Sequence, residues 1–165
     1  MIGNDVIDLA LAQKESNWRR KGFLDKIFTV KEQHLIATAE NQEEMVWNLW
    51  SRKEATYKIY NRQTQIRAFI PLQLECFDLD VQDGIVFGKV HCYDKTYFTK
   101  TRITFEYIET IAVLNYTDFN KVKHLKSSEN IIKIDRIPNY QNTVTNVLQQ
   151  ASISHHGRFE KIVTL

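Results

Sequence analysis

The clearest pattern of apolar and polar positions is a helical repeat over residues 41–62. One arc of its helical wheel carries the apolar and aromatic side chains Val46, Trp47, Trp50 and Tyr57. Asn41 followed three residues later by Glu44 is a capping pattern, which predicts where the helix begins. The sequence therefore predicts one long amphipathic helix with an aromatic face.

Shorter elements precede this helix. Residues 2–9 are rich in β-branched side chains and predict a short strand, after which residues 10–21 are compatible with a helix that Gly22 ends. Thr29 followed three residues later by Glu32 is a capping-box pattern, which predicts a second helix running to about residue 40.

After residue 66 the pattern changes from helical to strand-like. Segments rich in β-branched and aromatic residues cover residues 69–79, 85–93, 97–107 and 109–116. Asp83-Gly84, between the first two, is a strong hairpin signal. Because helices come first and strands follow, we expect an α+β fold in which about three helices pack on an antiparallel sheet.

The last third of the chain has weaker patterns. A polar, lysine-rich segment covers residues 115–130, and residues 131–137 predict a strand that Pro138 ends. The remaining expected elements are a short helix over 143–150, a turn over 154–157 and a final strand over 159–165.

Composition fits a single globular domain spanning residues 1–165. Of the 165 residues, 43% are hydrophobic and 25% are charged, and no apolar run is long enough to span a membrane. The beginning of the chain has Asp5 and Asp8 among its apolar residues and does not resemble a signal peptide. A net charge of +2 is too small to indicate nucleic-acid binding. Cys76 and Cys92 form no metal-binding pattern and are expected to be reduced, which favours a cytoplasmic protein.

Glu54 is the most informative polar residue of the long helix. It lies at the edge of the aromatic arc, four residues after Trp50 and four before Lys58. A carboxylate beside indole and phenol rings is partly desolvated and requires compensation. An ion pair with Lys58, which stabilises a helix by about 0.2–0.5 kcal/mol, is one source. A bound metal ion is the other, and the helix alone leaves both open.

Three short blocks together resemble the 4′-phosphopantetheinyl transferase superfamily, and most closely its single-unit, holo-acyl-carrier-protein synthase type. They are Gly3-Asn4-Asp5, Lys53-Glu54-Ala55 with Lys58, and Ser152-Ile153-Ser154-His155. The Phe28-Thr29 and Glu32 segment also resembles a block of this family, in which it has a capping and packing role. The blocks occur here in the family's order.

The resemblance implies an activity. Members of the family hold Mg²⁺ between two acidic side chains and the pyrophosphate of coenzyme A. They transfer 4′-phosphopantetheine to a serine of an acyl carrier protein and release 3′,5′-ADP. For this chain it implies Mg²⁺ as cofactor, coenzyme A as substrate, and an acyl carrier protein of fatty acid or polyketide biosynthesis as partner.

The resemblance also implies roles for individual residues. Asp5 and Glu54 match the metal ligands, and Glu54 and Lys58 would be catalytic. Either Glu54 or a metal-bound water would accept the proton of the serine hydroxyl. The residues implied in binding the phosphates of coenzyme A are Lys53, Lys58, Ser154 and His155.

Other interpretations and the assembly also follow from the sequence. A non-catalytic relative that binds coenzyme A or a protein is the main alternative. Binding of an acidic partner by the basic run Arg19-Arg20-Lys21 alone is a third. Larger members of the family hold two units in tandem and this chain holds one. We therefore expect a homo-oligomer with active sites between subunits.

Overall fold

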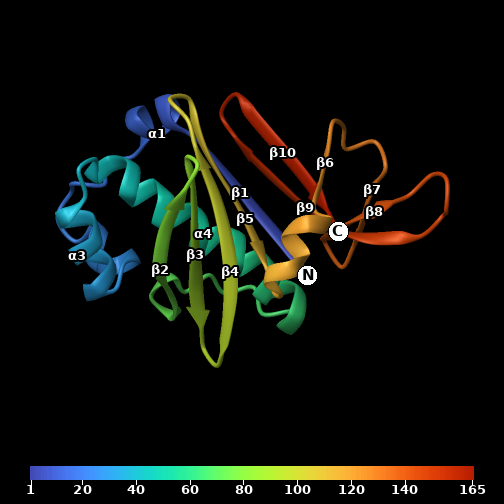
Figure 1. The fold of residues 1–165 in the computed structure, drawn as a ribbon, viewed down its shortest axis with the longest axis horizontal. Coiled ribbons are helices and arrows are strands. Elements are labelled where there is room, and N and C mark those ends of the chain that lie inside the picture. The colour runs from blue at the N-terminus through green and yellow to red at the C-terminus, as the bar shows by residue number, and fades with distance from the viewer.

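The computed structural model describes residues 1–165 and confirms an α+β fold. Its centre is a five-stranded antiparallel sheet in the order β1-β5-β4-β3-β2, seen in Figure 1. The strands are β1 (Ile2–Asp8), β2 (Leu74–Gln82), β3 (Ile85–Cys92), β4 (Lys95–Ile103) and β5 (Tyr107–Val113). The predicted meander is therefore confirmed as β2 to β5, and the first strand joins it beside the last.

The helices lie between β1 and β2 in the chain. They are α1 (Leu9–Glu15), α2 (Phe23–Ile27), α3 (Val30–Thr38) and α4 (Gln42–Thr64), followed by the 3₁₀ turn η1 (Pro71–Gln73). Capping decides where two of them begin. Thr29 and Glu32 form the predicted reciprocal capping box on α3, and Asn41 accepts a hydrogen bond from the Glu44 amide on α4. The helix predicted over residues 10–21 ends earlier, at Glu15.

The long helix α4 covers one face of the first sheet. Its apolar stripe, including Leu49, Ala55 and Ile59, is fully buried in the main core. Strand β1 approaches α4 so closely that a side chain at Gly3 would lie 2.0 Å from the Ala55 carbonyl oxygen. Only glycine permits this contact, which brings the next inward-facing residue, Asp5, against the helix.

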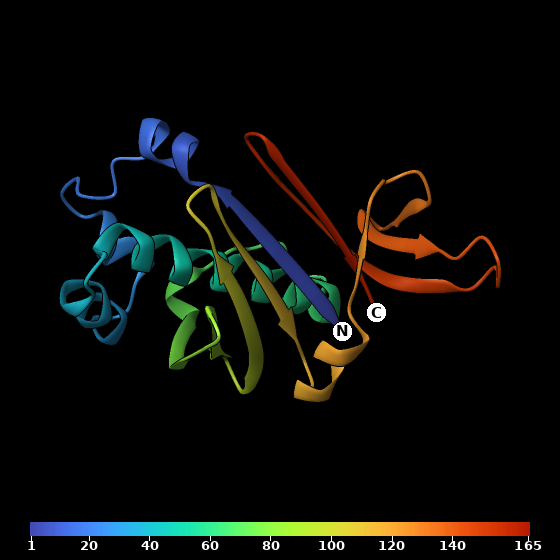
Figure 2. The same ribbon diagram turned by 45° about the horizontal axis from the view of Figure 1, so that its top comes forward.

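A second five-stranded sheet, in the order β6-β10-β9-β8-β7, follows the first. Its strands are β6 (Lys123–Leu125), β7 (Ile131–Ile134), β8 (Ile137–Gln141), β9 (Leu148–His156) and β10 (Phe159–Thr164), preceded by the 3₁₀ turn η2 (Tyr116–Lys121). The long β9–β10 hairpin runs beside β1 in both ribbon views (Figures 1 and 2). The sequence patterns predicted several of these strands but not a separate second sheet.

Side chains of β9 join the two sheets. The hydroxyls of Ser152 and Ser154 accept hydrogen bonds from the amides of Asn4 and Val6, at 3.0 Å and 2.9 Å. Two residues further along each strand, Nδ1 of His156 accepts from the Asp8 amide at 2.9 Å. Because β1 is an edge strand, these alternate side chains satisfy amides that no neighbouring backbone reaches.

Three predictions for the last third were wrong. Residues 131–137 form no single strand, because Asp135 and Arg136, both with positive φ, make a two-residue turn between β7 and β8. Pro138 lies within β8, opposite Lys133 and just before pairing with β9 begins, where no amide is needed.

The helix predicted over residues 143–150 is also absent. The Asn142 side chain accepts hydrogen bonds from the amides of Val144 and Thr145, which closes a turn, and β9 begins at Leu148. Local side-chain bonding of this kind competes with helix formation. The turn predicted over 154–157 is confined to Gly157-Arg158, so Ser154 and His155 lie on a strand.

No helix in the structure combines the length and apolar character needed to cross a membrane. Cys76 and Cys92 are buried and free, as the composition predicted. The predicted final strand is confirmed as β10.

Candidate functional site

A cleft of about 310 Å³ lies where β1, α4 and β9 meet. Its polar lining includes Asp5 from β1, Glu54 from α4 and His155 from β9. Its apolar lining includes the aromatic side chains of Phe23, Trp47 and Trp50. Residues 5, 54 and 155 were predicted from three distant parts of the sequence, and the fold brings them to one place.

Asp5 is held by contacts from both neighbouring elements. The Ser154 hydroxyl donates a hydrogen bond to Oδ1 of Asp5 at 3.0 Å, and Nζ of Lys58 lies 3.9 Å from the same oxygen. Burial raises the pKa of the Asp5 carboxyl, and the charge of Lys58 opposes that effect. The carboxyl therefore carries a desolvation cost that its partners offset only in part.

Glu54 is the more strongly perturbed of the two acids. Burial, and secondarily the negative charge of Asp5, raise the pKa of Glu54 to about 7, while Lys58 acts in the opposite direction. Two carboxyls thus share one nearby ammonium group. An ion pair with Lys58 was one of the two ways expected to offset the burial of Glu54. Lys58 is present, but Asp5 shares the same ammonium charge.

A divalent cation suits this donor set. Mg²⁺ prefers oxygen ligands and keeps several waters, so one or two protein carboxylates suffice to bind it. Asp5 and Glu54 supply hard oxygen donors in a cleft that is partly open. Nowhere does the structure gather three or more histidine, cysteine or carboxylate side chains into a metal cage. The residues present therefore fit a partly hydrated magnesium ion rather than a closed metal site.

Lys58 is positioned by the backbone. Its Nζ donates hydrogen bonds to the carbonyl oxygens of Asn4, at 2.5 Å, and Ile153, at 3.1 Å. Burial lowers the pKa of Lys58, although both acids of the cleft oppose the shift. The side chain also lines a smaller hollow of about 170 Å³ with Arg62 and Arg136. Lys58 therefore lies between the cleft and this smaller hollow, which is basic.

Ser154 and His155 have different environments although they are adjacent. Ser154 is buried, and its hydroxyl donates to Asp5 and accepts from the Val6 amide. His155 is exposed and lines the cleft without a hydrogen bond. In this structure the Ser154 hydroxyl is occupied within the chain, so only His155 of this pair is free to meet a phosphate.

Lys53 is absent from the site, against the prediction. Its side chain is fully buried, where Nζ pairs with Oε2 of Glu32 at 2.7 Å and donates to the carbonyls of Pro71 and Leu74. Adjacent residues on a helix differ by about 100° in direction, so Lys53 and Glu54 point to different faces. Glu32, expected to cap and pack, also accepts from the Cys76 amide and connects α3 with α4 and β2.

Most residues that line the cleft were not predicted as part of a site, among them His156, Trp47 and Trp50. His156 belongs to the only histidine pair in the sequence, and Trp47 and Trp50 belong to the aromatic arc. The arc indicated a buried face but gave no sign that its edge is a cleft wall. Recognising the edge of the arc as a cleft wall requires knowing where β9 lies.

Comparisons with known proteins support this assignment of the fold. A sequence profile of the 4′-phosphopantetheinyl transferase superfamily matches residues 1–112, which include Asp5, Glu54 and Lys58 but not Ser154 or His155. No curated protein sequence matches the chain.

Two solved structures are similar in fold. The Helicobacter pylori holo-[acyl-carrier-protein] synthase, solved in complex with coenzyme A, has 14% sequence identity and a TM-score of 0.50, covering 70% of this chain and 100% of that one. The Thermotoga maritima holo-[acyl-carrier-protein] synthase has the same identity, 14%, and the same TM-score, 0.50, with 78% of each chain covered. At this identity the likeness extends to the fold alone.

Proposed function

Because the chain belongs to the 4′-phosphopantetheinyl transferase superfamily, we propose that it transfers 4′-phosphopantetheine from coenzyme A to a serine of an acyl carrier protein. The observation that carries the proposal is the pair of carboxyls, Asp5 and Glu54, that come from separate elements and line one cleft, with the charge of Lys58 acting on both. This arrangement suits phosphoryl chemistry, in which catalysis depends on positioning and charge neutralisation.

Asp5 and Glu54 would hold Mg²⁺, which supplies positive charge to the phosphate oxygens. The Ser154 hydroxyl, through its bond to Oδ1, fixes the orientation of the Asp5 carboxylate. Lys58, whose Nζ is fixed by two carbonyls, adds a positive charge at the inner end of the cleft. The residues thus provide a fixed arrangement of charge before substrate binds.

In the transfer step, the carrier serine oxygen forms a bond to the β-phosphorus of coenzyme A. The bond from that phosphorus to the bridging oxygen breaks, and 3′,5′-ADP leaves with the electron pair. The serine proton passes to the Glu54 carboxylate, which lines the cleft. His155, exposed at the cleft, is placed to donate a hydrogen bond to a phosphate oxygen.

The surroundings of the cleft suit the two substrates. Its volume, about 310 Å³, holds only part of coenzyme A, and its aromatic wall offers apolar surface for the pantetheine arm. The Arg20 guanidinium lies 5.4 Å from the ring centre of Phe23, which itself lines the cleft. The basic run at residues 19–21 is therefore near the entrance, where an acidic carrier protein would dock.

A binding-only relative is the second candidate, and one observation favours it. Two of the groups expected to contact phosphate are already engaged within the chain: Lys58 by two backbone carbonyls and Ser154 by Asp5. A protein of this kind would bind coenzyme A in the cleft without transferring its phosphopantetheine.

Mass spectrometry of a bacterial acyl carrier protein distinguishes the two. The carrier is incubated with this protein, coenzyme A and Mg²⁺, with and without a chelator. We expect the carrier to gain one phosphopantetheine group, and the chelator to prevent the gain. Coenzyme A binding without any gain on several carrier proteins would contradict the transfer proposal and favour the binding-only candidate.

The matched variants are Glu54→Gln and Lys31→Gln. Glu54→Gln removes the acid of the cleft, whereas Lys31→Gln removes an exposed ion pair with Glu75 outside it. We expect transfer to be lost only in the first. Circular dichroism of both variants checks that the fold is retained.

Light scattering at several concentrations tests the homo-oligomer that we propose on the basis of the family, and a monomer throughout would contradict it.

A further inference from the structure

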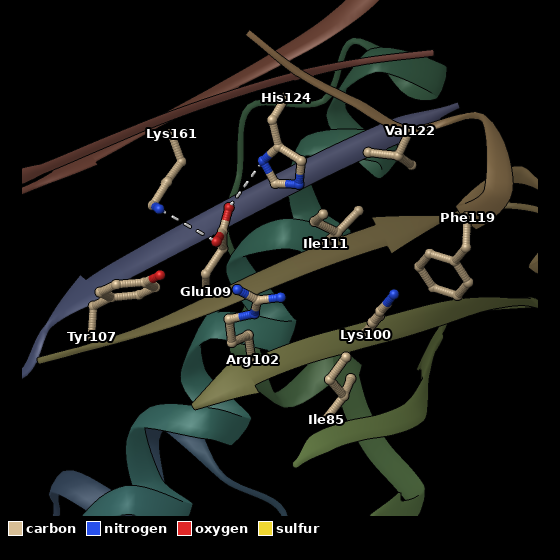
Figure 3. A pocket seen from close by; sticks show the side chains of 10 residues that line it. All are labelled: Ile85, Lys100, Arg102, Tyr107, Glu109, Ile111, Phe119, Val122, His124 and Lys161. Atoms are coloured by element: carbon tan, nitrogen blue, oxygen red, sulfur yellow. Dashed lines mark ion pairs between the residues drawn. The ribbon is translucent and has the colours of Figure 1, made fainter. Parts of the chain in front are cut away.

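A groove of about 360 Å³ lies on the face of the first sheet that α4 leaves open. Strands β3, β4 and β5 form its floor, and β6, β10 and η2 form its walls, as Figure 3 shows. Its volume is within the range of small-molecule sites in proteins. It is separate from the cleft, because Glu109 in the groove and Thr110 beside it face opposite sides of β5.

The groove carries more positive than negative charge. Lys100 and Arg102 extend from β4 into it, two residues apart on one face, and neither forms an ion pair or a side-chain hydrogen bond. Lys161 and His124 reach it from β10 and β6. The single carboxylate, Glu109, lies 3.5 Å from each of these last two. Neither cation has a carboxylate within ion-pair distance, although Nζ of Lys100 lies 5.8 Å from the ring centre of Phe87 and Arg102 is opposite Glu109 in the β4–β5 ladder.

Glu109 is the one carboxylate that lines the groove, and the protein already holds it. Its side chain is only 8% exposed, with Oε1 lying 3.5 Å from Nδ1 of His124 and Oε2 lying 3.5 Å from Nζ of Lys161. Oε1 is itself buried, so a ligand in the groove does not reach it. The groups left to meet a ligand are therefore the cations of β4.

Apolar side chains complete the lining. Ile85, Ile111 and Phe119 lie around the cationic side chains and provide surface on which a flat ring can pack. The groove therefore offers two kinds of contact at once: neighbouring cations and apolar surface. An ordinary solvated ion pair would require only the first.

We propose that this groove binds a small phosphate ester of the nucleotide class. The phosphate lies between Lys100 and Arg102, whose guanidinium is suited to two parallel hydrogen bonds with an anion. The base of the nucleotide packs on the apolar lining. The site lies on the opposite face of the sheet from Asp5 and Glu54, so its occupation does not require phosphopantetheine transfer.

The histidines provide a direct test, because they report on different places. His124 lines the groove, His155 and His156 line the cleft, and His34 and His91 lie at neither site. The imidazole resonances of the full chain are followed by NMR during titration with adenosine 5′-monophosphate, adenosine or inorganic phosphate. His124→Gln assigns the groove signal. We expect the monophosphate to shift His124 at the lowest concentration and adenosine at the highest.

Two double variants test the cations. Lys100→Gln with Arg102→Gln should weaken the nucleotide titration at His124 at least about tenfold, because charge-assisted bonds to the phosphate are lost. Lys126→Gln with Lys133→Gln removes equal charge from exposed positions outside the groove and should leave it unchanged. If both double variants weakened nucleotide binding equally, the effect would come from the overall charge of the protein, and the proposed site would be overturned.

Three other outcomes would also overturn the proposal. They are an unmoved His124 with every probe, a His124 signal that changes with protein concentration alone, and a response to an acidic carrier protein but not to nucleotide. The second would assign the groove to another copy of the chain and the third to a macromolecule. Coenzyme A provides the separate check on the transfer function, since its failure to shift His155 or His156 counts against the cleft and not the groove.

Discussion

The two faces of the first sheet carry opposite excesses of charge. On the face covered by α4, the cleft holds two carboxyls, Asp5 and Glu54, with one lysine between them. On the other face, the groove holds several cations around one carboxylate, Glu109. Because neighbouring residues of a strand point to opposite faces, a single sheet separates an acidic site from a basic one.

The comparison shows how burial converts unequal charge into a binding preference. In the cleft, burial raises the pKa values of both acids, so a cation that neutralises them lowers the free energy. In the groove, neither Lys100 nor Arg102 has an ion pair within the protein, so an anion is the stabilising addition that we propose. Each site has an excess of the opposite charge, which is why we propose a metal ion for one and a phosphate ester for the other.

The largest expected effect separates the two carboxylates that define the sites. Glu54→Gln should lower the transfer rate by roughly 10²–10⁴-fold, because it removes the group that we propose as general base and metal ligand. Glu109→Gln should leave the rate unchanged, because that side chain faces the groove. Mass spectrometry of the carrier protein over time measures both. A similar loss in both variants would mean that the sites are not independent.

The next effect is a pH dependence of stability that belongs to the cleft. Burial raises the pKa of Glu54 from 4.5 to about 7, so between these pH values the folded state binds more protons than the unfolded state. The stabilisation from the protonated acid is present below pH 4.5 and is lost as pH rises through 7. We expect the free energy of unfolding to fall by about 2–3 kcal/mol more in the native protein than in Glu54→Gln over that range.

Urea titrations at several pH values measure this difference, and Mg²⁺ provides the control. Because metal binding requires deprotonated carboxylates, Mg²⁺ should raise the unfolding midpoint at pH 8 and have little effect at pH 5. Parallel pH profiles of the native protein and Glu54→Gln would show that this carboxyl is not perturbed.

A smaller effect separates two serines that share one structural role. Ser152 and Ser154 both accept a hydrogen bond from an edge amide of β1, but only Ser154 also donates to Asp5. Each alanine variant should lower the free energy of unfolding by about 1–3 kcal/mol, because a buried amide loses its acceptor. Transfer should decline only in Ser154→Ala. Equal transfer rates in the two variants would remove the positioning role of Ser154.

The smallest effect concerns the groove. His124 is exposed and lies 3.5 Å from Glu109, so His124→Gln should change the free energy of unfolding by about 0–1 kcal/mol. Urea unfolding at neutral pH measures it, with the native protein as reference. A loss larger than about 2 kcal/mol would identify the groove charges as structural elements rather than a binding surface.

Local signals predicted much of the first half of the fold. The capping box at Thr29 and Glu32, the cap at Asn41 and the hairpin at Asp83-Gly84 all act over two to four residues, and the structure confirms each of them. The errors lie where short polar segments have competing options. The turn at residues 142–147 depends on side-chain bonds from Asn142, which a helical pattern of apolar positions does not report.

The candidate site was likewise predicted in part from the sequence. Motif resemblance brought Asp5, Glu54 and His155 into one hypothesis, and the fold gathers them in one cleft. The same resemblance included Lys53, whose side chain is buried against Glu32 instead. The helical period already separates the directions of residues 53 and 54, so this error was avoidable from the sequence.

The amino-acid sequence by itself determined the long helix, the meander and the caps, because these depend on periodicity and on neighbours within a few positions. The acids of the cleft were implied by the resemblance of short motifs to a family. Only the tertiary structure decided that the Ser154 hydroxyl holds Asp5, that a second sheet lies beside β1, and that Glu109 meets Lys161 and His124. Those contacts join residues far apart in the chain, and their geometry exists only once β9 and β10 are placed against the first sheet.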